Sequence, residues 1–143
     1  MKNFFYIARF YPEQINFFDK LGFSRNFSVN KKIKGILNSL NQLKNIKTGV
    51  ISTTIENPRI PIKNKKFSLG KIQIFTPNYH RNYFRIISYF LNIISTTKLI
   101  NKRFKINNKS YFICWDFLPD TILPILFSNV PLKNIIMDIE ELI

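Results

Sequence analysis

The stretch that decides the fold is SYFICWDFLPDT at 110–121, together with NIIMDIEE at 134–141. Each contains an apolar run of strand length that ends in carboxylates, Asp116 in the first and Asp138 in the second. A Pro/Asp turn and a short apolar segment suited to a helix lie between them, which gives the order strand, helix, strand. In open parallel α/β sheets, ligands bind outside the carboxyl ends of the strands. We therefore expect these acids to lie together at one edge of a sheet.

The charges of the chain are unevenly distributed. The 143 residues include 22 Lys or Arg and 8 Asp or Glu, for a net charge of +14. Residues 1–115 hold 21 of the basic residues and three of the acidic ones, whereas residues 116–143 hold one basic and five acidic residues. The five late acids are Asp116, Asp120, Asp138, Glu140 and Glu141. The chain thus combines a basic body with one acidic corner.

Outward from this corner, the pattern predicts an alternation of strands and helices. Ile33, Ile36, Leu37 and Leu40 have the i, i+3, i+4, i+7 spacing of one apolar helix face, and Asn30 is a suitable N-cap. The expected strands are 3–11, 46–54, 71–75, 110–116 and 134–139, the expected helices are 31–43, 80–104 and 121–128, and 12–30 is expected to be a loop. Apolar strands connected by helices favour a mostly parallel sheet covered on both faces. The fold class predicted is therefore α/β with a mostly parallel sheet, and residues 1–143 are expected to form one domain.

The helix expected at 80–104 has two interpretations. Its apolar residues form a broad band, and basic residues interrupt it. The band comprises Phe84, Ile86, Ile87, Phe90, Leu91, Ile93 and Ile94. We expect this band to pack on the sheet, and the alternative is a basic amphipathic helix lying on an anionic bilayer.

Several classes of function are disfavoured by composition. Cys114 and His80 are the single cysteine and histidine, so neither a disulfide nor a metal site is expected, and Cys114 suits a buried strand position. The apolar start of the chain is interrupted at Arg9, and no apolar run is long enough to span a membrane, so we expect a cytoplasmic protein. The basic residues are scattered between apolar runs, without the stripe or module of a nucleic-acid-binding protein, and we expect no nucleic-acid partner.

Three segments resemble a known family. The helix NKKIKGILNSL at 30–40 leads from the opening strand towards VIS at 50–52, and WDFLPDT at 115–121 is followed by Leu123 and Pro124. The third segment is IIMDIEE at 135–141. In this order they resemble the N-terminal Rossmann-like domain of GT-B glycosyltransferases, in the large retaining family that builds polysaccharides and glycolipids. The resemblance covers nearly the whole chain in the order of its elements.

The resemblance implies an acceptor-side half of a glycosyltransferase, either truncated or one subunit of a split enzyme. Such a half binds a sugar or lipid-linked acceptor, while a nucleotide-sugar donor, a substrate and not a cofactor, is held by a second domain or subunit. Peripheral contact with the inner face of the membrane fits a lipid-linked acceptor. The alternative function is a non-catalytic basic α/β module that binds an anionic membrane surface or a protein partner.

Site residues follow from this resemblance and from position in the chain. Glu140 and Glu141 are the catalytic candidates, because a carboxylate at the cleft hydrogen-bonds acceptor hydroxyls. The acceptor-binding candidates are Asp116, Asp120 and Asp138. Lys31 and Lys32 are expected at a helix N-terminus, where ammonium and backbone N–H groups together hold phosphate. For each of these residues a purely structural role is the alternative: a cap, a turn, a solvated charge or an ion-pair partner.

Overall fold

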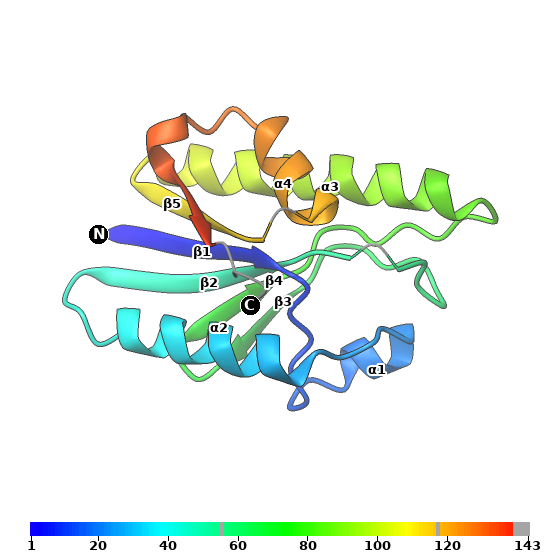
Figure 1. Cartoon of the computed structure of the whole chain (residues 1–143), viewed down its shortest axis with the longest axis horizontal. Helices are drawn as coiled ribbons and strands as arrows, with labels where there is room; N and C mark the ends of the chain where they lie inside the picture. Colours follow the sequence, from blue (N-terminus) through cyan, green and yellow to red (C-terminus); the bar gives the residue numbers. More distant parts are fainter. Residues whose placement is uncertain (55, 117, 139–143) are drawn as a thin grey trace, which may run out of the picture.

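A computed structural model describes residues 1–54, 56–116 and 118–138 of the chain. It is an α/β protein with a six-stranded, mostly parallel sheet in the order β3-β4-β2-β1-β5-β6 (Figure 1). The strands are β1 (Lys2–Ala8), β2 (Ile46–Ser52), β3 (Lys66–Leu69), β4 (Ile72–Phe75), β5 (Ser110–Trp115) and β6 (Ile135–Asp138). The helices are α1 (Phe17–Leu21), α2 (Phe27–Leu40), α3 (Arg85–Ile106), α4 (Pro119–Leu126) and the 3-10 turn η1 (Leu132–Asn134). The Rossmann-like fold class predicted from the sequence is confirmed.

The order of the strands reverses next to β1. The chain passes from β1 to β2 and β4 on one side, and then crosses through α3 to β5 and β6 on the other side of β1. Strands β1, β2, β4, β5 and β6 are parallel, with Tyr6 of β1 opposite Val50 of β2 and Ile113 of β5. The carboxyl ends of β1 and β5 therefore flank a topological switch point, where ligands bind in open α/β sheets.

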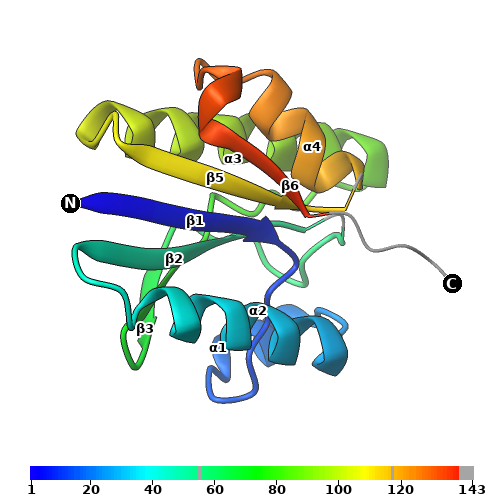
Figure 2. The same cartoon turned by 60° about the vertical axis from the view of Figure 1, so that its left-hand side comes forward.

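The helices cover both faces of the sheet. Helices α1 and α2 lie on one face, and α3 and α4 lie on the other (Figure 2). The core beneath α2 includes Tyr6, Ile33 and Leu37, and the core beneath α3 and α4 includes Phe112, Ile100 and Ile125. Alternate side chains of the central strands point into the two cores, which is why these strands are apolar throughout.

The loop predicted at 12–30 is wrong in part. The short helix α1 lies within it and buries Phe18 and Leu21, and the left-handed Gly22 (φ 76°) ends that helix. Helix α2 begins earlier than expected, because the side chain of Asn26, not of Asn30, caps it by accepting a hydrogen bond from the Val29 N–H. Its two turns before Ile33 carry too few apolar residues for their helical period to stand out in the sequence.

Two further differences concern short elements. Strand β3 was not predicted, since it has four residues, lies at the edge of the sheet and is paired antiparallel with β4 alone through a two-residue hairpin. Helix α4 begins two residues before the predicted start: Pro119 is its first residue, and Thr121 lies inside its first turn. Pro is favoured at a first helical position because its missing N–H has no partner there.

Most of the segment 80–104 is helical, as part of α3. The expectation that its apolar band packs on the sheet is wrong for most of that band. Helix α3 does bury Ile93, Leu99 and Ile100. Five of the seven band residues are nevertheless exposed: Phe84, Ile86, Ile87, Phe90 and Ile94. Within 1–54, 56–116 and 118–138, no helix is both long enough and apolar enough to cross a membrane.

Candidate functional site

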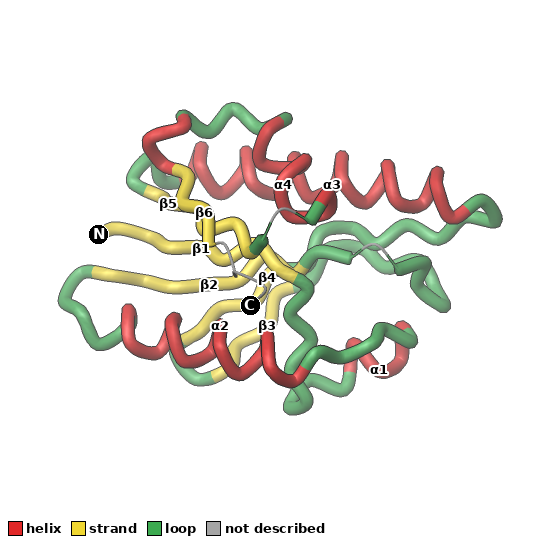
Figure 3. The backbone as a smooth tube through the Cα atoms, viewed as in Figure 1, coloured by secondary structure: helices red, strands yellow, loops and turns green. Residues whose placement is uncertain are grey.

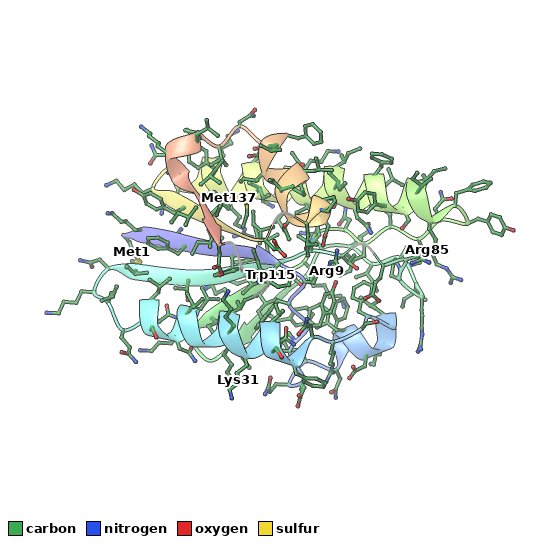
Figure 4. All side chains as sticks on the ribbon, in the orientation of Figure 1. Met1, Arg9, Lys31, Arg85, Trp115 and Met137 are labelled. Carbon is green, nitrogen blue, oxygen red and sulfur yellow. The ribbon has the colours of Figure 1, made fainter. Side chains whose placement is uncertain are left out.

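The candidate site is the carboxyl edge of the sheet around the switch point between β1 and β5. The chain leaves β1, β2 and β4 at this edge through its longer loops (Figure 3). Arg9 follows β1, Thr53 follows β2, and Asp116 follows β5. Figure 4 shows Arg9 and Trp115 near the ends of β1 and β5.

A partly buried ion pair joins the two sides of the switch point. The Arg9 guanidinium donates to both carboxylate oxygens of Asp120, with Nε–Oδ2 at 2.8 Å and Nη2–Oδ1 at 2.7 Å. The Thr53 hydroxyl donates to the same carboxylate at 3.0 Å. Burial alone would lower the pKa of Arg9, but the hydrogen bond and the charge of Asp120 raise it, so Arg9 stays protonated. We call Arg9, Thr53 and Asp120 the switch-point cluster.

Asp120 was predicted as an acceptor-binding residue. Its side chain is 2% exposed, and both oxygens already accept hydrogen bonds within the switch-point cluster. Asp120 is therefore placed to orient Arg9, whose side chain is 27% exposed and reaches the edge. The neighbouring Tyr89 is half-buried, and burial followed by the charge of Asp120 raises the pKa of its hydroxyl, which keeps it a neutral hydrogen-bonding group.

Buried tyrosines fix the loops that carry this cluster. The Tyr11 hydroxyl donates to the Thr53 carbonyl at 2.6 Å, and the Tyr79 hydroxyl donates to the Ser52 carbonyl at 2.8 Å. The Ser52 hydroxyl in turn donates to the Phe10 carbonyl at 2.7 Å. Burial raises the pKa of both tyrosines well above the ordinary value, so they act as fixed donors. The segments after β1, β2 and β4 are thus held in one arrangement.

A second polar cluster lies on the α2 side of the same edge. The Tyr6 hydroxyl donates to Asp138, and the Lys32 ammonium lies 3.2 Å from Asp138 Oδ2. The side chains of Lys32 and Asp138 are 30% and 24% exposed. We call Tyr6, Lys32 and Asp138 the Asp138 cluster. Its carboxylate is more accessible than that of Asp120, and a ligand hydroxyl can therefore approach it from solvent.

Asp116 lies beside this cluster, as predicted from the ends of the two strands. Trp115 of β5 is opposite Asp138 of β6, and the Asp116 N–H donates to the Asp138 carbonyl at 2.8 Å. Asp116 has a left-handed backbone (φ 57°), a conformation that Asp adopts more readily than most residues. Asp116 and Asp138 therefore meet at one edge of the sheet.

The predicted phosphate site at Lys31 and Lys32 is not at a helix N-terminus. Because α2 begins at Phe27, both lysines lie in its second turn. Lys32 pairs with Asp138, whereas Lys31 is exposed on the side of α2 away from the sheet (Figure 4). Lys31 does line a cleft of about 280 Å³ between α2 and the segment that follows β1, together with Asn30, Lys34, Phe10, Pro12 and Glu13.

Glu140 and Glu141, the two catalytic candidates, lie outside the described residues. The indole N–H of Trp115, which is 9% exposed, has no partner among the residues that the structure describes. This N–H is buried with the rest of the Trp115 side chain in the core beneath α2.

Cys114 is buried on β5, as predicted, and burial raises the pKa of its thiol to about 12. It is therefore not a nucleophile at neutral pH.

His80 contributes its backbone to the structure: its N–H donates to the side chain of Asn92, and its carbonyl accepts from Ser88. In the described ranges, no three His, Cys, Asp or Glu side chains gather as a metal site would require.

Sequence reasoning missed Arg9, Thr53 and Tyr6. Arg9 and Thr53 each directly follow an observed strand, but the predicted strands 3–11 and 46–54 ran past both residues and so hid this signal. Tyr6 lies inside β1, where nothing in the sequence distinguishes it from a core residue. As a whole, the edge offers the carboxylates of Asp116 and Asp138 and a guanidinium held by Asp120, which suits the hydrogen bonding of a polar ligand.

Comparisons of the chain with protein-family models, curated proteins and solved structures found no match.

Proposed function

We propose that the chain is the acceptor-side half of a GT-B-type glycosyltransferase that transfers a sugar from a nucleotide-diphosphate donor to a polysaccharide or lipid-linked acceptor. The observation that carries the proposal is that Asp116 and Asp138 meet at the carboxyl edge of a parallel sheet, and that Arg9, paired with Asp120, follows β1 at the switch point of the same edge. Polyhydroxylated ligands need carboxylate acceptors and fixed donors in one place, and this edge supplies both.

Each group has a role in the proposal. Asp116 and Asp138 accept hydrogen bonds from acceptor hydroxyls, and Arg9, oriented by Asp120, donates to acceptor oxygens. Lys31 and Lys34, beside the cleft after β1, attract the phosphate of a lipid-linked acceptor. Glu140 and Glu141 remain the catalytic candidates. Transfer itself depends on positioning the acceptor hydroxyl and on neutralising the charge that develops on the leaving phosphate.

The donor would bind to a second domain or subunit that closes on the same edge. Such an enzyme works in the cytoplasm, where nucleotide sugars are made, and its product enters polysaccharide or glycolipid synthesis. The alternative, a non-catalytic basic module, needs no saccharide at the switch point. The two functions are therefore distinguished by whether the chain binds sugars there.

The first experiment is saturation-transfer NMR of the chain with a panel of oligosaccharides and a short-chain polyprenyl phosphate sugar. We expect weak saccharide binding that Asp116→Asn and Asp138→Asn each reduce severalfold. Asp19→Asn is the matched control, because Asp19 is an exposed carboxylate on α1 whose partner is Arg25. Circular dichroism checks that each variant is folded.

The second experiment follows the release of nucleoside diphosphate from a set of nucleotide sugars, with the chain alone and with candidate donor-binding domains. Turnover with a partner, abolished by Glu140→Gln or Glu141→Gln, supports the proposal. The absence of saccharide binding and of turnover in every combination would favour the non-catalytic module. Unchanged rates in both glutamate variants would remove these two residues from the site.

A further inference from the structure

Helix α3 carries an unusually apolar exposed surface. Its first three turns, with the two residues before them, expose large apolar side chains to solvent. We call this set the α3 patch: Tyr83, Phe84, Ile86, Ile87, Phe90 and Ile94. Tyr83 is 93% exposed, and every member is at least 42% exposed. The spacing of Ile86, Ile87, Phe90 and Ile94 places them on one side of the helix.

The inner side of the same turns is polar. Ser88, Asn92, Ser95 and Thr96 are buried there. Asn92 accepts from the His80 N–H at 2.7 Å, Ser95 accepts from the Asn78 N–H at 2.8 Å, and Ser88 donates to the His80 carbonyl. These bonds hold the loop between β4 and α3. The helix is therefore fixed with its apolar side outward, and rotation to bury the patch would leave these backbone groups unpaired.

The patch also projects from the molecule. The N-terminal part of α3 extends past the ends of the strands, whereas its C-terminal part lies over the sheet (Figure 1). A convex apolar ridge of aromatic and branched side chains is suited to insertion into a soft, planar phase. Amphipathic helices that lie in a bilayer interface bury such a side among the lipid headgroups and upper acyl chains.

The charge around the α3 patch favours some binding surfaces over others. Residues 57–115, which include all of α3, contain 12 Lys or Arg and no Asp or Glu. Arg81 and Arg85 flank the patch, and Lys98 follows Ile94 by one helical turn. A second copy of the chain would bring the same uncompensated charge against it, which disfavours self-association. An anionic lipid surface is complementary, because basic residues near it gain electrostatic free energy.

We propose that the α3 patch docks the protein on an anionic bilayer, with the patch among the acyl chains and Arg81, Arg85 and Lys98 at the headgroups. This docking does not depend on the proposed transferase function, since it uses neither Asp116 nor Asp138. If the chain also binds a lipid-linked acceptor, docking would bring the carboxyl edge of the sheet near the membrane, because α3 begins on that side.

The test is flotation of the full chain with vesicles of phosphatidylcholine, alone or with roughly one third phosphatidylglycerol. We expect binding at least about tenfold tighter to the anionic vesicles, weakening as salt is added. The double variant Ile86→Ser, Phe90→Ser should lower this affinity by about tenfold or more, because two large apolar side chains leave the lipid. Arg85→Gln should lower it about fivefold.

The matched control is Phe27→Ser with Leu43→Ser. These two side chains are as exposed as Ile86 and Phe90; Phe27 begins α2, on the other face of the sheet, and Leu43 lies in the turn that follows α2. The control should bind as the original chain does. Equal affinity for neutral and anionic vesicles, an equal loss in the control, or no vesicle binding would each overturn the proposal. Sedimentation showing a dimer that the Ile86, Phe90 double variant abolishes would assign the patch to a second copy instead. None of these outcomes bears on the sugar-binding experiments.

Discussion

Helices α2 and α3 cover opposite faces of the same sheet, yet α2 buries an apolar stripe along its length whereas the first half of α3 buries mostly polar side chains. Helix α2 buries Val29, Ile33 and Leu37 and exposes Lys31. The first half of α3 buries Ser88 and Asn92 and exposes Phe90. Helix α2 is held by apolar packing, whereas the first half of α3 is held by hydrogen bonds to a neighbouring loop and its second half packs Leu99 and Ile100 into the core. An outward apolar side is thus compatible with a firmly placed helix when its inner side has specific polar partners.

The largest expected effect concerns the ion pair on the α3–α4 side of the sheet. Asp120→Asn leaves the partly buried Arg9 guanidinium without its counter-charge, and we expect a loss of about 3 kcal/mol in the free energy of unfolding. Chemical denaturation at neutral pH measures it. The double variant Arg9→Met, Asp120→Leu should recover most of the loss, since an apolar pair needs no counter-charge.

The surface pair of Asp19 and Arg25 is the control for this change. Asp19 is 54% exposed, and Asp19→Asn should cost less than about 1 kcal/mol. If Asp120→Asn cost no more than Asp19→Asn, the pair would not hold the switch point together. Polar contacts would then not be what fixes the α3–α4 side of the sheet.

The next effect compares the two helices directly. Leu37→Ala on α2 removes a fully buried side chain and should lower the free energy of unfolding by about 3 kcal/mol. Phe90→Ala on α3 removes a larger side chain that is mostly in solvent and should change it by less than about 0.5 kcal/mol. Chemical denaturation of both variants under the same conditions measures the two changes in the free energy of unfolding. Similar losses in the two would mean that Phe90 is covered in the isolated chain.

The sequence predicted the buried side of α2 better than the buried side of α3, for a physical reason. The apolar residues of α2 form one stripe, so only one of its sides can face the core. The apolar residues of α3 include Ile86, Leu91, Leu99 and Ile100, which are spread around the helix. Periodicity alone cannot then choose the buried side, and the hydrogen bonds that do choose it come from the loop around His80.

The candidate site was predicted in part for a similar reason. Asp116 and Asp138 could be placed together because each ends an apolar strand, and parallel strands end at one edge. Their partners come from far along the chain: Arg9 and Asp120 are 111 residues apart, and Tyr6 and Asp138 are 132 residues apart. Such pairings follow from the strand order, which local patterns do not specify. The cap of α2 was misplaced because Asn26 and Asn30 are both suitable caps, and the second instead bonds the backbone of Tyr11.

The smallest expected effect tests the inner side of α3. Asn92→Leu keeps the approximate size of the side chain but leaves the His80 N–H without its acceptor, and we expect a loss of about 1–2 kcal/mol in the free energy of unfolding. The same variant should speed hydrogen exchange at the His80 amide, which a general loss of packing would not single out. Asn38→Leu on the exposed side of α2 is the matched control and should change stability by less than about 0.5 kcal/mol. A stabilised Asn92→Leu protein with unchanged exchange at His80 would contradict the assignment, because α3 would then be held by apolar contacts like those of α2.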